Sequence, residues 1–162
     1  MREDEGLIDE PIGPARHDPR LRMVREDGQD AITRYRVEER FARATALRVA
    51  LETGRTHQIR VHLAHRGHPV VGDRAYGARP TRAIRRPALH ARRVALRQPR
   101  SGERLTFEAP LPEDLLALLE KLRGGAGGSI GAPVTDPAHD AGSADTRDQQ
   151  LDQGDREEGE KR

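Results

Sequence analysis

Residues 54–77, GRTHQIRVHLAHRGHPVVGDRAYG, form the segment around which this chain is organised. The segment holds four of the chain's seven histidines, at positions 57, 62, 65 and 68. Glycines at positions 54, 67, 72 and 77 divide it into short pieces, and glycine is favoured at turns and helix ends. No other part of the sequence is as dense in side chains that carry chemistry, so a functional site is expected here.

The composition limits the classes of protein that this chain can represent. At 162 residues it is long enough for one domain or part of one. Residues 1–123 carry 25 basic and 18 acidic side chains, whereas residues 124–162 carry four basic and nine acidic ones. A basic globular part suits a polyanionic partner. The plainer interpretation is a compositional bias, because all but two of the basic residues are arginine, and both interpretations stay open.

Several kinds of site are excluded by what the sequence lacks. There is no cysteine, which excludes disulfides, thiolate zinc sites and a cysteine nucleophile. No apolar run approaches membrane-spanning length, and the N-terminal residues MREDEGLIDEP are too polar for a signal peptide. The chain is therefore expected to be soluble and cytoplasmic.

Alternation of polar and apolar residues predicts the strands. They are expected over residues 30–41, 45–51, 89–96 and 105–109. The first two are close enough in sequence to form an antiparallel hairpin, with Thr33 and Tyr35 on the same face of a half-buried first strand. Residues 1–30 are expected to be irregular, with DEPIG at residues 9–13 as an extended piece.

Two helices are predicted from their end signals. The first follows Thr56 as N-cap and stops at Gly67. The second covers residues 111–123, where acidic residues begin the helix, basic residues end it and four leucines form an apolar stripe. From residue 124 onward the sequence has too few apolar residues for a core, so an acidic disordered tail is expected.

The chemistry of the central segment is narrowed by its spacing. Zinc motifs of the HExxH type place a glutamate between two histidines, and no such arrangement surrounds His62 and His65. Neither a GxSxG elbow nor a GxxxxGK[ST] loop is present. No metal site is therefore expected. What remains is an arginine-rich helix start, which favours phosphate or carboxylate because of its free N–H groups.

Arg60 is the most distinctive residue of this helix start, because it lies between the apolar Ile59 and Val61. A guanidinium held there matches a pair of carboxylate or phosphate oxygens. The alternative is that Arg60 is an ordinary solvated helix residue, and physical reasoning on the sequence leaves both open.

The segment LETGRTHQIRVHLAHRGHPVVGDRAYG resembles the third conserved motif of the RluA/RluD-type RNA pseudouridine synthases. The flanking blocks, from DEPIG to GRTHQIR and from LHARRVALRQPRSGERLTFEAPLPEDLLALLEKL onward, are similar to the family's surrounding segments, so the resemblance covers about residues 6–123. It implies an α+β fold with a mostly antiparallel sheet. It also implies isomerisation of uridine to pseudouridine in structured RNA, most simply ribosomal RNA, without cofactor or metal.

The resemblance also implies roles for residues. Arg60 occupies the position of the family's arginine that pairs with a nucleophilic aspartate, and Ile59 the position that lines the base pocket. Arg55, His57 and Gln58 are expected to bind substrate. The family's HRLD motif, which holds the aspartate, occurs nowhere in the sequence.

The missing motif leads to an expectation about the whole chain. Residues 1–123 are expected to be the C-terminal half of the catalytic domain, inactive alone, with the other half as a partner beside the RNA. Arg60 would then be a desolvated cation without its partner, and the incomplete sheet would expose an apolar edge. The alternative function is a non-catalytic RNA-binding remnant, in which Arg55, Arg60 and the arginines of residues 79–86 contact phosphates.

Overall fold

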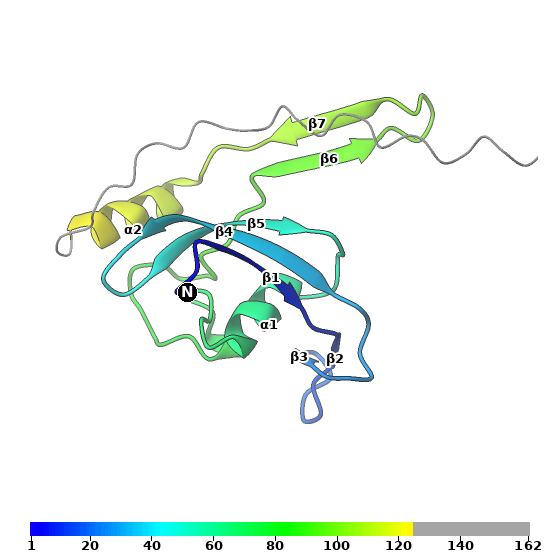
Figure 1. The fold of residues 1–162 in the computed structure, drawn as a ribbon. Coiled ribbons are helices and arrows are strands. Elements are labelled where there is room, and N and C mark those ends of the chain that lie inside the picture. The colour runs from blue at the N-terminus through cyan, green and yellow to red at the C-terminus, as the bar shows by residue number, and fades with distance from the viewer. Residues whose placement is uncertain (125–162) are drawn as a thin grey trace, which may run out of the picture. The chain divides into compact units, whose positions relative to one another are not determined.

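The computed structural model describes residues 1–124 and confirms the α+β class. Its elements run along the chain as β1 (Glu5–Asp9), β2 (Ile12–Pro14), β3 (Arg22–Val24), β4 (Ile32–Arg40), β5 (Thr45–Leu51), α1 (Gln58–His65), the short 3₁₀ helix η1 (Arg74–Tyr76), β6 (Arg93–Arg97), β7 (Arg104–Glu108) and α2 (Glu113–Gly124) (Figure 1). Every strand pairing among these residues is antiparallel. The expected acidic tail lies outside the described residues, apart from Gly124.

The largest sheet has three strands in the order β1-β4-β5. β4 and β5 form the predicted hairpin, with Tyr35 opposite Val49 and a register shift between Val37 and Glu39. Burial alternates along β4 as the pattern predicts, since Thr33 and Tyr35 are buried while Arg34 is exposed. The strand prediction for residues 30–51 is therefore confirmed.

Residues 1–30 are not irregular, so this prediction is wrong. β1 pairs with β4 as an edge strand, and Ile8 lies opposite Thr33. β2 and β3 form a separate two-stranded pair in which Ile12 faces Val24. The prolines of this region exclude a helix but not short strands, because proline is tolerated at strand ends and edges.

Helix α1 packs against the strands through two apolar clusters. One joins Leu63 and Val70 to Ile8 and Tyr35 of the sheet. The other joins Val61 to Ile12 and Ala31, and α1 lies along one face of the β1–β4–β5 sheet (Figure 1). Two of the apolar clusters therefore include α1, and burial of Val61, His62 and Leu63 fixes the position of this helix.

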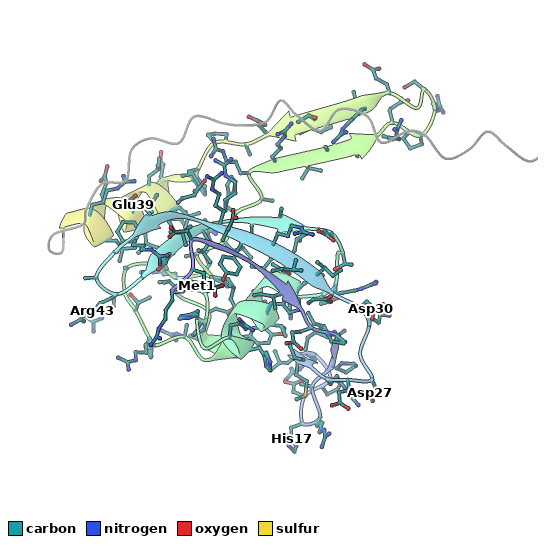
Figure 2. All side chains as sticks on the ribbon, viewed as in Figure 1. Met1, His17, Asp27, Asp30, Glu39 and Arg43 are labelled. Atoms are coloured by element: carbon teal, nitrogen blue, oxygen red, sulfur yellow. The ribbon has the colours of Figure 1, made fainter. Side chains whose placement is uncertain are left out.

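Helix α2 is confirmed, although it begins at Glu113 rather than at residue 111. Leu115 and Leu118 pack on Ile84 in the loop before β6. At the other end of the helix, Arg123 donates to Glu39, whose side chain lies beside α2 in Figure 2. None of the helices within residues 1–124 is long and apolar enough to span a membrane.

The strands β6 and β7 form a hairpin on their own, closed by a turn in which Gly102 has φ +70°. β6 is shorter than predicted, because the chain up to Arg92 is not a strand. One face of the hairpin carries exposed apolar side chains, namely Val94, Leu96 and Phe107, of which Phe107 is 58% exposed. Within the described chain no third strand joins this pair.

Candidate active site

The entry to α1 differs from the predicted one. The N-cap is His57 rather than Thr56, and its backbone is left-handed, with φ +60°. His57 is the only described non-glycine residue with a positive φ. No side chain caps the helix in the usual way. The side chain of Gln58 instead reaches back to the loop that precedes the helix.

Gln58 is buried, and its amide is fully used inside the protein. Its Oε1 accepts from the Thr53 hydroxyl and from the Arg55 N–H, both at 2.9 Å. Its Nε2 donates to the Ile32 carbonyl at 2.9 Å and to Thr33 Oγ1 at 3.0 Å. Gln58 therefore fixes the loop to β4, and a substrate contact through it would require one of these bonds to open.

Arg60 makes a two-point ion pair with Asp73. Nε and Nη2 donate to the two carboxylate oxygens at 2.7 and 2.8 Å. The Asp73 side chain is 0% exposed and the Arg60 side chain 19%. The expectation of an unpaired Arg60 is wrong, because this chain supplies a carboxylate 13 residues further on. These hydrogen bonds raise the pKa of Arg60 above its usual range, so the guanidinium is always charged.

Tyr76 completes the cluster around Arg60. Its ring lies against the guanidinium, with 4.7 Å from Arg60 Cζ to the ring centroid, a distance at which the ring attracts a cation. The Tyr76 hydroxyl accepts from the Arg22 N–H at 3.0 Å and contacts His57 Nδ1 at 2.7 Å. Burial, reinforced by the charges of Arg60 and Arg22, lowers the pKa of His57. His57 is therefore a neutral hydrogen-bonding ring near pH 7.

A turn holds Asp73 and Tyr76 in place. Both flanking glycines have left-handed backbones, Gly72 at φ +80° and Gly77 at φ +85°. The Asp73 carbonyl accepts from the N–H groups of Tyr76 and Ala78, at 3.3 and 3.0 Å. One short turn therefore presents both a carboxylate and an aromatic ring to Arg60.

The crowded histidines do not form one site. His62 is completely buried, with Nδ1 2.8 Å from Thr33 Oγ1 and Nε2 2.9 Å from the Glu10 carbonyl. Since that carbonyl can only accept, Nε2 carries the proton, and burial lowers the pKa of His62. His68 is exposed and lies 3.0 Å from the N-terminal nitrogen. Across residues 1–124, no group of three histidine, aspartate or glutamate side chains could hold a metal ion.

The other predicted residues, Arg55 and Ile59, make contacts outside this cluster. Arg55 is exposed, and its Nε donates to the Asp30 carbonyl at 2.9 Å. Ile59 is half-buried and packs against the core cluster that includes Leu63. Beside the turn, a hollow of about 360 Å³ is lined by Gly72, Arg74, Thr81, Ile84 and Arg85. The basic loop of residues 78–87 thus begins at the site.

Sequence reasoning missed Asp73 and Tyr76 as partners of Arg60. A signal was present, because the two residues are three positions apart in GDRAYG, between glycines that favour a tight turn. Such a turn brings side chains at this spacing to one side. The partner on α1 could not be chosen from that spacing alone.

Comparison with known proteins shows which proteins this chain is similar to. A family model described as RNA pseudouridylate synthase matches residues 1–65. The Bacillus subtilis protein named "Uncharacterized RNA pseudouridine synthase YlyB" is 48% identical over 123 residues, covering 76% of this chain and 41% of that protein. The Haemophilus ducreyi protein named "Ribosomal large subunit pseudouridine synthase D" is 46% identical over 133 residues, covering 73% of this chain and 40% of that protein.

Solved structures agree with these sequence matches. The structure titled "Human RNA Pseudouridylate Synthase Domain Containing 1" matches with a TM-score of 0.58 at 27% identity, over 76% of this chain and 61% of that one. In both fold and sequence, the chain is similar to RNA pseudouridylate synthase domains. The chain belongs to the RluA/RluD-type family of these proteins. It spans about 40% of the length of the curated relatives that it matches.

Proposed function

We propose that this chain provides the arginine side of an active site that isomerises uridine to pseudouridine in RNA. The observation that carries the proposal is the Arg60 guanidinium, which lies in the family's motif and is fixed on one edge by Asp73. Ribosomal RNA is the proposed substrate, because several relatives are named as ribosomal large subunit pseudouridine synthases. The reaction would take place in the cytoplasm and use no cofactor or metal.

The proposed roles follow from where the side chains lie. Arg60 would pair with the nucleophilic carboxylate, whose charge it stabilises in the ionised form. Ile59 would face the base, and the exposed Arg55 would contact a phosphate. His57 would act as a neutral hydrogen-bonding group beside Tyr76. Gln58 would support the site indirectly, by holding the loop that carries Arg55.

The HRLD motif, to which the family resemblance assigns the nucleophile, is absent from these 162 residues. We therefore include in the proposal that residues 1–123 act as the C-terminal part of a catalytic domain. Isomerisation would require the remaining part, supplied either in a longer chain or as a second polypeptide. Alone, this chain would bind RNA without converting uridine.

The test is a pseudouridine assay on ribosomal RNA, with this chain alone and with a form extended by the residues encoded upstream in frame. Pseudouridine should form with the extended form only, and Arg60→Ala should abolish most of it while RNA binding persists. Asp18→Asn is the control, because the Asp18–Arg20 pair is exposed and lies in the β2–β3 loop. Near-normal turnover by the Arg60→Ala form would refute the assignment of Arg60.

A non-catalytic RNA-binding function is the second candidate, and the charge distribution favours it. Residues 74–102 contain nine arginines and no acidic residue. In the described part of the chain, Arg74, Arg79, Arg82 and Arg85 have no ion-pair partner. Arginines in this state can neutralise phosphates and release counterions. RNA affinity that stays constant between low and high salt would exclude this function.

A further inference from the structure

The geometry of Arg60 leaves half of its guanidinium available. The Asp73 carboxylate takes one N–H of Nε and one of Nη2, out of the five N–H donors of an arginine. Among residues 1–124, every buried polar side-chain atom has a hydrogen-bond partner. No described residue accepts from Arg60 Nη1, so Nη1 is not among the buried atoms and its edge reaches the surface.

The turn around η1 supplies two residues that hold the Arg60 guanidinium, one at its edge and one over its face. Asp73 is fully buried and grips the Nε side, while the Tyr76 ring covers one face of the guanidinium at 4.7 Å. Tyr76 is fixed in turn by the backbone of Arg22 and by His57. Arg60 therefore cannot change rotamer without breaking contacts with two different residues.

We propose that Asp73 and Tyr76 are positioning residues for Arg60, which aim its Nη1 edge at the carboxylate that takes part in the reaction. The contact between Nη1 and the reacting carboxylate rests on the proposed function, whereas the positioning of Arg60 by Asp73 and Tyr76 does not. A free arginine side chain loses considerable rotamer entropy when it binds an anion. Here that entropy is lost on folding, so the outward edge is already oriented when the anion arrives.

Asp73 also tunes the charge of the site. It neutralises Arg60 on the inner side, so the pair has no net charge before a second carboxylate reaches Nη1. The geometry allows both carboxylates to be bound at once, because they use different edges of the same planar group. Asp73 can therefore keep the inner edge while the incoming carboxylate binds the outer one.

The first test uses NMR of the arginine guanidinium in this chain as it stands. The Arg60 Nε–H signal should be resolved and slow to exchange, and Asp73→Asn should abolish this protection. Asp18→Asn is the matched control, since Asp18 binds the same two atoms of Arg20 at 3.0 and 2.9 Å on the surface. The proposal would be overturned if the Arg60 Nε–H exchanged rapidly with water in the unmodified chain. It would also be overturned if this Nε–H still exchanged slowly in Asp73→Asn.

The second test separates positioning from simple stabilisation, and uses the form that makes pseudouridine. Asp73→Asn should lower kcat about 10–100-fold with a much smaller effect on KM, the size expected when a reactive group is misplaced. In an Arg60→Ala background it should cause no further loss. Tyr76→Leu should lower kcat more than Tyr76→Phe, which keeps the ring. Equal losses with and without Arg60 would refute positioning.

The two proposals can fail separately. If no form of the chain makes pseudouridine but Asp73→Asn releases Arg60 in the NMR experiment, the proposed function fails and the positioning stands. If pseudouridine forms and Asp73→Asn leaves both kcat and the Arg60 signal unchanged, the positioning fails and the function stands.

Discussion

Replacing Arg60 by methionine should expose how much the buried ion pair controls this fold. The change removes the guanidinium and keeps a similar apolar stem, while the Asp73 carboxylate stays 0% exposed. Since Arg60 provides the only hydrogen bonds that the structure gives to that carboxylate, a buried charge is left unpaired. Removing one partner of a buried pair typically costs about 3–5 kcal/mol, and the free energy of unfolding should fall by about that amount near pH 7.

A double variant shows whether the loss comes from the unpaired charge. Arg60→Met/Asp73→Asn should be more stable than Arg60→Met near pH 7, because it leaves no buried charge without a partner.

The assay is urea unfolding followed by circular dichroism near pH 7. Arg20→Met is the matched control, because Arg20 makes the same two-point contact with Asp18 at the surface and is 88% exposed. It should leave the unfolding midpoint unchanged. An Arg60→Met variant that loses less than about 1 kcal/mol, and that Asp73→Asn does not make more stable, would refute the reasoning.

Three further predictions follow from other parts of the structure. Burial lowers the pKa of His62 from its usual value of 6.5, so the unfolded chain binds the proton more readily than the folded protein does. The free energy of unfolding should therefore be greatest above pH 6.5 and fall as the pH drops below it. His62→Asn should flatten this pH dependence in urea titrations. Gly72→Ala should destabilise by about 2–5 kcal/mol, because the added Cβ would lie 2.3 Å from the Arg86 carbonyl oxygen in a left-handed backbone; Gly77→Ala, which has the same backbone and no neighbour within 4 Å, should cost only about 1–2 kcal/mol in the same thermal unfolding experiment. Changing Arg79, Arg82 and Arg85 together to glutamine should reduce the slope of log affinity for RNA against log salt by about 2–3, and an unchanged slope would show that these arginines do not contact phosphates.

The sequence was most informative where a structural rule acts over neighbouring residues. The β4–β5 hairpin follows from uninterrupted alternation, and α2 from its charges and leucine stripe. The short strands β2 and β3 were not predicted, because three residues are too few to show an alternating pattern. They become strands by pairing with each other, which no local pattern indicates. Local rules also named the wrong helix cap, because the N-cap is His57 in a left-handed backbone and no side chain accepts from the first helical N–H groups.

The site was predictable only in part, because its residues meet through contacts between distant parts of the sequence. The resemblance directed attention to Arg60, and the structure places Arg60 beside His57 and Tyr76. The identity of its carboxylate partner depends on how the turn at Asp73 folds back on α1, which no spacing rule specifies. A buried arginine requires a counter-charge, so a search for the nearest carboxylate on a tight turn would have pointed to Asp73.

The exposed hairpin β6–β7 has a consequence for how unfolding is observed. Two strands without a third strand or a covering layer are only marginally stable, so their amide hydrogens should exchange through local opening at a free energy well below that of the β1–β4–β5 sheet. The chain has no tryptophan, and its two tyrosines lie on β4 and in the η1 turn. Tyrosine fluorescence therefore reports on the core and on the surroundings of Arg60, whereas circular dichroism also records the hairpin. The two signals should lose their native values at different denaturant concentrations, with the hairpin opening first.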